Sequence, residues 1–436
     1  MAEWQPAPFF LREGFLSDAK ALLVPLCQRL AGYGYPGKES VGMENSRLPS
    51  QHLVHGLRRL VHDLHSREPL PGHGLSGIIC GTTDLISFHR ESAQYCGEDI
   101  PLLVEQHGFE SIAWLLLSGE LPSEDQLADL QAIVADAAVI DCTAAEMLER
   151  IPLSTRPLDL LPLCVSILSF FDPTPHDQCQ EATRSRVWRL LAQLPVALAA
   201  GLGKPLVDGS LPDSDSAVTL SWAGRLLHCL RDQSNPPGPT EDAAMNALMA
   251  CECLTEMRPA CFAARFAGST VSNITAAMQS ASVMFVSQLR NDPFAWASDV
   301  LLGLDGPAGA EEWLRKREGQ PMPFGFGART SDPRPEILRE HCRSMLGSHR
   351  RIVLEASACR LERLLEKREL FPTTDWAAAR LMTLLNIPAD RQALVVGMAR
   401  IVGWAAQAIE QQSAGVSLLP VLEYGAQSKT TAISND

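Results

Sequence analysis

The chain of 436 residues has little positive charge for its size. Lysine and arginine total 37 against 51 aspartates and glutamates, which gives a net charge of −14 at pH 7. A field of this sign repels phosphate backbones and anionic lipid headgroups. Nucleic acid is therefore not expected as a partner, whereas an anionic small molecule could still be held by a local group of arginines.

Long apolar runs are absent as well. The longest, such as LLPLCVSILSFF at Leu160–Phe171, are shorter than the ~20 residues that a membrane helix needs. The N-terminus, MAEWQPAPFF, lacks the basic start and apolar core of a signal peptide. We expect a cytoplasmic protein that is neither exported nor inserted into a membrane.

The sequence also lacks the common motifs of metal and nucleotide sites. It contains no glycine-rich phosphate loop, nucleophile elbow or zinc-protease helix. The twelve cysteines show no paired spacing and are expected to be reduced thiols, and Cys251-x-Cys253 has no second half of a zinc site. Four histidines in a predicted helix at 50–66 lie opposite its apolar side, where a solvated face is favoured over a metal site. No metal site is expected.

What the sequence does contain is helical periodicity. Apolar residues make up 46% and charged residues 20%, as in globular proteins. One stretch, Gly74–Ile86, is typical of a short strand and is the only extended piece expected, and Gly306–Phe326 is typical of an exposed connection. The remaining pattern predicts a mainly α-helical fold. Helices are expected at 17–30, 50–66, 109–117, 123–137, 144–151, 158–171, 180–194, 217–231, 241–256, 260–286, 335–346, 352–366, 376–385 and 391–411.

An ordered set of motifs between residues 74 and 424 resembles the citrate synthase family. Each motif alone is weak, but together they follow the family's order. They are Gly74–Phe88, Gly97, Phe109–Pro122 (FESIAWLLLSGELP), Phe324–Gly327, Asp332–Arg334, Thr374–Trp376, Asn386–Ala389, Ala399–Trp404 and Glu410-Gln411.

The resemblance implies an all-α homodimer of two-domain subunits, with a smaller helical domain that closes over an interdomain cleft. We place an N-terminal arm and helix at 1–73, the large domain at 74–287 and 391–436, and the small domain at 288–390. The family condenses acetyl-CoA with oxaloacetate, so acetyl-CoA is expected as a co-substrate and no permanently bound cofactor is expected.

The resemblance also assigns roles to residues. Asp375 matches the catalytic aspartate, and Arg334 and Arg400 match two arginines that bind the oxo acid. The condensation itself also requires such groups. A thioester methyl group is a very weak acid, so its deprotonation needs a positioned base and a hydrogen-bond donor for the enolate oxygen. The alternatives are a helix N-cap for Asp375 and structural ion pairs for the arginines.

Three departures from the family concern its histidines, which fall on Thr255, near Ser287 and on Ala328. A third family arginine falls in residues 418–424, where no basic residue is present. If the chain is an enzyme, we expect the Ser287 hydroxyl or a backbone N–H to act as the donor for the enolate oxygen, with Thr255 or Arg329 near the oxo-acid carbonyl. Ordinary citrate synthase activity is not expected.

Two hypotheses about function remain. In the first, an altered enzyme condenses acetyl-CoA with another 2-oxo acid such as phosphonopyruvate, as in the phosphonomethylmalate synthases of phosphonate-antibiotic pathways, which resemble citrate synthase. In the second, the fold has lost catalysis and serves as a binding or regulatory subunit. Arg315, Lys316 and Arg317 are candidates for CoA binding, with a solvated loop as the alternative.

Overall fold

The computed structural model describes Leu75 and residues 78–88, 92–211, 220–233, 235–270, 273–289, 292–317 and 324–420. The chain forms two compact units, residues 1–79 and 80–436, and all elements named below belong to the second. The helices predicted at 17–30 and 50–66 lie outside the described residues.

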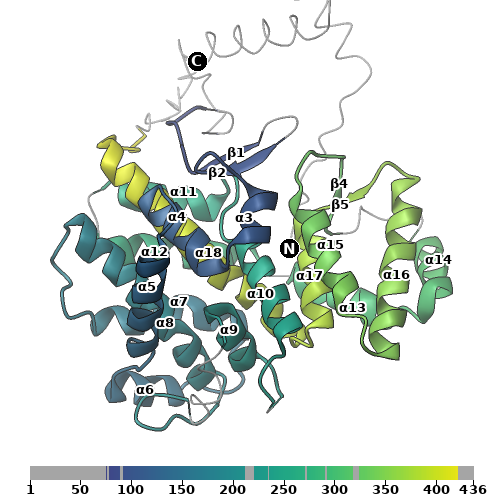
Figure 1. Cartoon of the computed structure of the whole chain (residues 1–436), viewed down its shortest axis with the longest axis horizontal. Coiled ribbons are helices and arrows are strands. Elements are labelled where there is room, and N and C mark those ends of the chain that lie inside the picture. The colour runs from purple at the N-terminus through teal and green to yellow at the C-terminus, as the bar shows by residue number, and fades with distance from the viewer. Residues whose placement is uncertain are drawn as a thin grey trace, which may run out of the picture. The chain divides into compact units, whose positions relative to one another are not determined.

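Helices dominate the described part of the chain, as predicted (Figure 1). The helices are α3 (Ile100–Gln106), α4 (Phe109–Ser118), α5 (Glu124–Asp136), α6 (Cys142–Glu149), η1 (Pro157–Asp159), α7 (Leu160–Phe170), α8 (Gln180–Gly201), α9 (Trp222–Leu230), α10 (Pro239–Glu252), α11 (Pro259–Gly268), α12 (Ile274–Gln288), α13 (Pro293–Gly303), α14 (Gly306–Lys316), α15 (Arg334–Ser344), α16 (His349–Glu366), α17 (Thr374–Leu384) and α18 (Ala389–Ala414). The strands are β1 (Ile86–Phe88), β2 (Ala93–Tyr95), β3 (Glu98–Asp99), β4 (Phe326–Gly327) and β5 (Phe371–Pro372).

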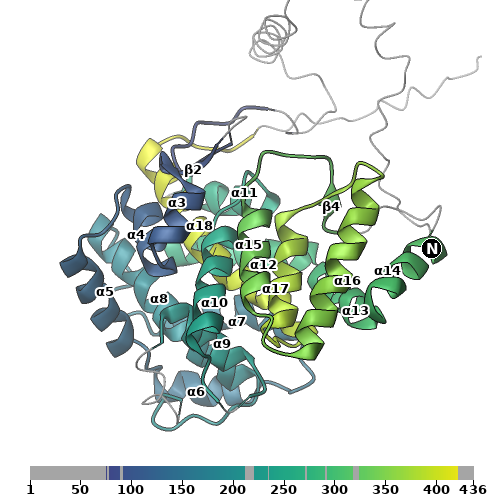
Figure 2. The same ribbon diagram turned by 45° about the vertical axis from the view of Figure 1, so that its right-hand side comes forward.

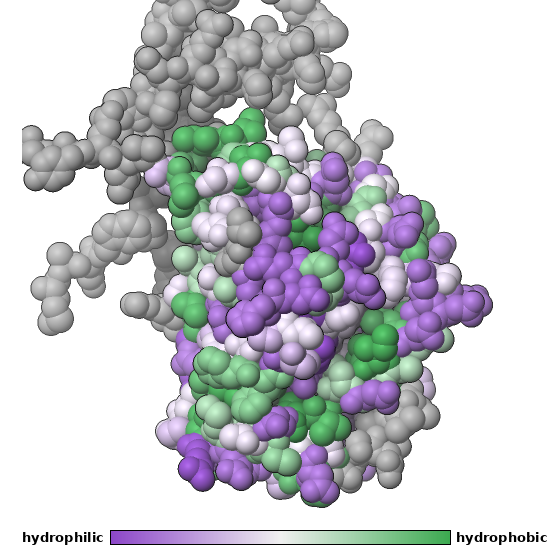
Figure 3. All heavy atoms as spheres, turned by 90° about the vertical axis from the view of Figure 1, so that its left-hand side faces the viewer, coloured by the Kyte–Doolittle hydropathy of each residue, from purple (hydrophilic) through white to green (hydrophobic). Residues whose placement is uncertain are grey.

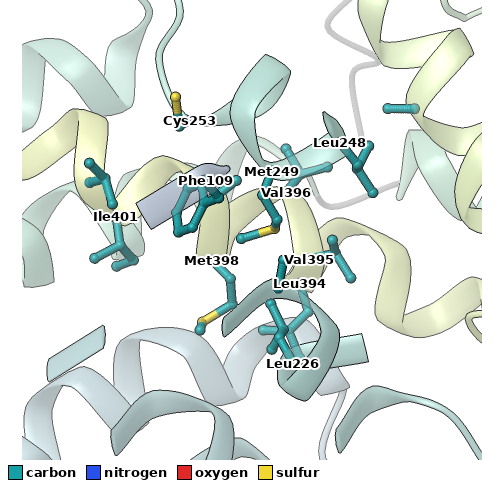
Figure 4. Packing of buried hydrophobic residues seen from close by; sticks show 14 of the residues in the cluster. Phe109, Leu226, Leu248, Met249, Cys253, Leu394, Val395, Val396, Met398 and Ile401 are labelled. Atoms are coloured by element: carbon teal, nitrogen blue, oxygen red, sulfur yellow. The ribbon is translucent and has the colours of Figure 1, made fainter. Parts of the chain in front are cut away.

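Helix α18 forms the centre of the core. It packs against α4, α10, α11, α12 and α13, and Figure 2 shows it behind α10 and beside α11. Figure 4 shows its side chains Leu394, Val395, Val396, Met398 and Ile401 among those of α4, α9 and α10. By length and composition α18 could cross a membrane, but 94% of its apolar window is buried inside the protein. Its apolar side chains are thus used for packing, as in the core helix of a globular protein.

A glycine lets α18 approach the end of α10 closely. A Cβ atom at Gly403 would lie 2.1 Å from the carbonyl oxygen of Cys253, which is backbone and cannot rotate away. We expect Gly403→Ala to lower the free energy of unfolding by ~1–3 kcal/mol through overpacking, despite the better helix propensity of alanine. Urea unfolding followed by circular dichroism measures this.

The matched control for that prediction is Gly309→Ala, also inside a helix. There the added Cβ meets its nearest atom at an ordinary 3.5 Å, so the variant should be as stable as the parent or more stable. Equal stability changes at Gly403 and Gly309 would contradict a specific close contact between α18 and α10.

The extended structure is more extensive than predicted. The segment 78–83 belongs to no strand; instead β1, β2 and β3 form an antiparallel sheet, and β4 pairs with β5. Cys96 and Gly97 both have positive φ, at 49° and 87°, and form the tight turn between β2 and β3. The prediction of one extended piece was wrong because two-residue and three-residue strands leave little periodicity in a sequence.

Several other predictions of helices need correction. Helices α3 and α13 were not expected from the sequence, and both have a proline in the first turn. The single helix predicted at 260–286 is two helices, α11 and α12, because the Asn273 side chain accepts a hydrogen bond from the Thr275 backbone N–H and begins a new helix. The connection predicted at 306–326 contains α14, whose buried Ala310 and Leu314 face α16. Glycine and proline at the start of α14 concealed this helix, although proline suits a first helical turn.

Helices α13 to α17 pack largely on one another, through the pairs α14 with α16, α15 with α17 and α13 with α17. They lie within the range predicted for the small domain, 288–390, and the boundaries of that domain stay a prediction. All eleven cysteines of the described part are free thiols.

The surface seen in Figure 3 carries polar side chains over its middle and apolar side chains in patches around them. Among the described residues, Leu153, Phe170 and Val283 are large apolar side chains exposed to solvent. Such residues could be covered in a dimer. The homodimer stays a prediction.

Candidate active site

A cavity of about 250 Å³ lies where α10, α15, α17 and α18 meet. Figures 1 and 2 both show α10, α15 and α17 side by side at this point. The strand pair β4–β5 holds the loop before α15 against the start of α17, because the backbone N–H of Thr373 donates to the carbonyl oxygen of Gly325 at 2.8 Å. The lining residues are Phe88, Glu252, Thr255, Glu256, Arg258, Thr330, Ser331, Asp332, Arg334, Pro335, Thr373, Thr374, Asp375 and Arg400.

Arg334, the first residue of α15, is firmly held by its neighbours. Its Nε and Nη2 donate to the carboxylate of Asp332, at 2.9 Å and 2.8 Å for the shortest bond of each. Its Nη1 donates to the backbone carbonyls of Cys251 and Leu254, at 3.3 and 3.0 Å. Most of its five N–H groups are therefore already in use, so this arginine combines the structural ion pair considered from sequence with a position on the cavity wall.

Asp332 depends on that arginine for its charge. Burial favours the neutral acid, but the hydrogen bonds from Arg334 outweigh burial and lower the pKa of Asp332 below its ordinary value. The hydroxyl of Thr374 also donates to Asp332, at 3.0 Å. This contact ties the first residue of α17 to the loop before α15.

Arg400, in the middle of α18, lies between two carboxyl groups. Its Nη2 donates to Oε2 of Glu252 at 2.9 Å and lies 3.6 Å from Oδ1 of Asp375. Its guanidinium also lies over the ring of Phe285, with 5.3 Å between the carbon atom Cζ and the ring centroid. Its Nε is buried and has no hydrogen-bond partner. Arg400, which lines the cavity, thus keeps an N–H group that no protein group accepts.

Asp375 lies in the first turn of α17, whose N-cap is Thr373 rather than Asp375. Its side chain is 16% exposed, and its Oδ2 lies 3.9 Å from Nη1 of Arg258, a half-exposed residue. Two arginines from different elements therefore face this carboxylate. The helix N-terminus adds a favourable field, as it does for any anion in a first turn.

Glu252, the last residue of α10, is a member of this site that sequence reasoning missed. Its side chain is only 2% exposed. Burial raises the pKa of Glu252, the charge of Asp375 raises it further, and Arg400 and Arg334 oppose the change. The available signal was a lone charge between Cys251 and Cys253, directly after the apolar stretch 247–251 near the end of helix α10. Asp332 and Arg258 were also missed.

The other predicted site residues are distributed more widely. Thr255 lines the cavity and lies 3.7 Å from the thiol of Cys261, measured from its hydroxyl oxygen. Ser287 is exposed near the end of α12, where its hydroxyl donates to the Met284 carbonyl at 2.8 Å, and it does not line the cavity. Arg329 lies outside the lining as well, with its guanidinium carbon 5.3 Å from the centroid of the Phe371 ring.

The basic residues considered for CoA occupy the end of α14 and also lie outside the cavity lining. Lys316 forms an ion pair with Glu312 at 2.8 Å, and the guanidinium of Arg317 lies over the rings of Trp296 and Trp313. In the described part of the chain, no three His, Cys, Asp or Glu side chains are grouped as a metal site requires. The cavity itself combines four carboxyl groups with three arginines, which suits a small anion and proton transfer.

Comparison with known proteins places these features in context. A family model described as "Citrate synthase, C-terminal domain" matches residues 74–419. The 2-methylcitrate synthase 1 of Corynebacterium glutamicum is 25% identical over 360 residues, which cover 80% of this chain and 94% of that protein. The citrate/2-methylcitrate synthase of Bacillus subtilis is 26% identical over 362 residues, which cover 80% of this chain and 95% of that protein.

Solved structures show the same fold. The citrate synthase of Pyrobaculum aerophilum superposes with a TM-score of 0.72 at 21% identity, covering 84% of this chain and 96% of that one. The citrate synthase of Thermoplasma acidophilum, solved with carboxymethyl coenzyme A and oxaloacetate, gives a TM-score of 0.70 at 18% identity, covering 84% and 99%. The all-α fold expected from the sequence is thereby confirmed.

Proposed function

Because the chain belongs to the citrate synthase family, we propose that it condenses an acyl-CoA, acetyl-CoA or propionyl-CoA, with a 2-oxo acid and releases CoA. In this proposal Asp375 removes a proton from the carbon next to the thioester carbonyl. The resulting enolate carbon attacks the keto carbon of the oxo acid, and water then cleaves the thioester to give the free acid and CoA. The reaction belongs to a cytoplasmic, homodimeric enzyme in this proposal.

One observation carries the proposal: Asp375, Arg334 and Arg400 line the same cavity, although they come from three different helices. They are also the residues that match the family's base and two of its oxo-acid arginines. A carboxylate between arginines is a suitable base for a carbon acid only when a bound substrate can reach it, and the 16% exposure of Asp375 towards the cavity permits this.

The charges of the cavity bear on which oxo acid is bound. Arg334 is mostly occupied by Asp332, whereas Arg400 and the exposed Arg258 keep N–H groups for a substrate anion. This set of N–H donors differs from two unoccupied guanidinium groups, each of which would hold a planar carboxylate through paired hydrogen bonds. We therefore include phosphonopyruvate beside oxaloacetate among the proposed acceptors, because a tetrahedral phosphonate accepts hydrogen bonds from several directions.

A second candidate function is a binding or regulatory subunit without catalysis. It is favoured by the residues at the three positions where the family has histidines: Ser287 and Ala328 lie outside the cavity lining, and Thr255 has no acidic proton to offer near neutral pH. The two functions differ in one product, since only the enzyme releases CoA.

The test is incubation of the purified chain with acetyl-CoA or propionyl-CoA and a panel of 2-oxo acids. The panel contains oxaloacetate, pyruvate, 2-oxoglutarate and phosphonopyruvate, and both free thiol and product mass are followed. We expect thiol release with one acid above the rate of thioester hydrolysis without acid. Release that is the same with and without every acid, together with tight binding of an oxo acid by calorimetry, would support the non-catalytic subunit instead.

A further inference from the structure

One buried carboxyl group of the cavity, that of Glu252, has no role in the reaction as proposed above. Glu252 ends α10, where its neighbours Ala250, Cys251 and Cys253 are all buried. Its Oε2 accepts the hydrogen bond from Arg400, but its Oε1 is buried without any hydrogen-bond partner. An unpartnered carboxylate oxygen in an apolar surrounding is costly, whereas a protonated oxygen there could donate to a bound molecule.

Glu252 and Asp375 share one guanidinium nitrogen, Nη2 of Arg400. A single positive charge does not support two carboxylates equally, so such a pair tends to divide into one acid and one base. Glu252 is the more buried member, with 2% exposure against 16% for Asp375. The environment therefore assigns the proton of the pair to Glu252.

The charged and titratable groups around Glu252 support the same assignment. Burial raises its pKa, and among its neighbours Asp375 acts in the same direction while Arg400 and Arg334 act against it. The other carboxyl groups of the cavity are different, because Asp332 is held charged by Arg334 and Glu256 is exposed. The charged groups that act on Glu252 are Arg400 on α18, Asp375 on α17 and Arg334 on α15. Its chain neighbours Cys251 and Cys253 are buried thiols, and the hydroxyl of Tyr95 on β2 donates to the backbone carbonyls of Cys251 and Leu254. Glu256 and Arg258 line the same cavity.

We propose that Glu252 is the general acid of the condensation, which donates its proton to the keto oxygen of the 2-oxo acid. This rests on the proposed function. As the enolate carbon bonds to the keto carbon, the electron pair of the carbonyl moves to oxygen, and that oxygen takes the Glu252 proton to become a hydroxyl group. Asp375 holds the proton taken from the acyl-CoA, and Glu252 is left as a carboxylate paired with Arg400. One proton is taken and one is given, so charge and atoms balance.

This role supplies a proton donor to a chain in which Thr255, Ser287 and Ala328, at the positions of the family's histidines, offer none. Arg400 acts at two stages of this proposed proton transfer. Before the reaction it binds the neutral acid and the oxo-acid anion, and afterwards it stabilises the new carboxylate of Glu252 at 2.9 Å.

The test compares the parent with Glu252→Gln in steady-state CoA release across pH. Glutamine has the size of the neutral acid, so the fold should be retained, and it cannot transfer a proton. We expect a loss of ~10²–10³-fold in kcat. In the parent, the rate should fall as pH rises through the pKa of Glu252, because the acid loses its proton, and this alkaline decline should be missing in the variant. Glu149→Gln, an exposed glutamate of α6, is the matched control and should behave like the parent.

A second measurement needs no turnover. Infrared difference spectra between parent and Glu252→Gln should contain the carbonyl band of a protonated carboxyl at neutral pH, which disappears at alkaline pH. The proposal is overturned if Glu252 is ionised at neutral pH, or if Glu252→Gln keeps a rate within twofold of the parent with the same alkaline decline. A protonated Glu252 in a chain that releases no CoA with any acid overturns the proposed function, and the catalytic step with it.

Discussion

Replacing Asp375 by asparagine is expected to lower the rate of CoA release by ~10²–10⁴-fold, the range that a positioned general base contributes. Asparagine has the same shape but cannot accept the proton of the acyl-CoA. Its amide also replaces the negative charge that faces Arg258 and Arg400, at 3.9 and 3.6 Å. The expected loss is therefore in kcat, measured as thiol release at saturating acyl-CoA and oxo acid, and the folded state should persist.

The matched control is Asp390→Asn. Asp390 occupies the first turn of α18 as Asp375 occupies that of α17, but it does not line the cavity. Both variants remove a negative charge from a helix N-terminus, which costs ~0.3–1 kcal/mol of stability. Only Asp375→Asn should remove activity. A rate for Asp375→Asn within tenfold of the parent would show that another group takes the proton and that Asp375 serves as an ion-pair partner only.

Replacing Arg380 by alanine should lower the free energy of unfolding by ~3–5 kcal/mol, because it leaves buried carboxylates without a counter-charge. Arg380, on α17, is fully buried, and its Nε donates to Glu355 at 2.8 Å while its Nη1 donates to Glu362 at 2.6 Å. Trp376 donates through its indole N–H to the same Glu362 oxygen at 2.8 Å. These bonds join α17 to α16 within five residues of Asp375.

The pKa of Arg380 shows how strongly this group is held. Burial alone would lower it, but Glu362 and Glu355 more than compensate and raise it above its ordinary value. The variant is measured by urea unfolding beside Arg363→Ala, an exposed arginine of α16 whose loss should cost below ~1 kcal/mol. Similar losses in the two variants would indicate that the network around Arg380 contributes specificity of packing rather than stability.

Much of the helical structure could be predicted because helix formation is local. Hydrogen bonds join residues four apart, so apolar periodicity and caps are visible in the sequence, as for α4 at Phe109–Ser118 and α5 at Glu124–Asp136. The failures occurred where a helix has a proline in its first turn, as α3, α13 and α14 do, and where one apolar pattern continues across the gap between α11 and α12.

The candidate site was partly predictable as well. The motifs around Asp375, Arg334 and Arg400 identify residue types and their order, and the structure brings these three to one cavity. Ser287 was grouped with them by its motif position, and Arg329 and the basic residues 315–317 by their charge near a glycine-rich segment; all of them lie outside the cavity lining. The position of a side chain in three dimensions depends on the direction in which its helix faces, which a motif does not encode.

By itself, then, the sequence determined the acidic character of the protein, its mainly helical fold and the three residues that match the family's base and arginines. Only the tertiary structure decided that Arg334 also binds the backbone carbonyls of Cys251 and Leu254 and that Glu252 shares Arg400 with Asp375. The physical reason is distance along the chain: Glu252 and Arg400 are 148 residues apart. Whether a carboxyl group is buried, and which charge it meets there, is set by the packing of helices that are remote in sequence.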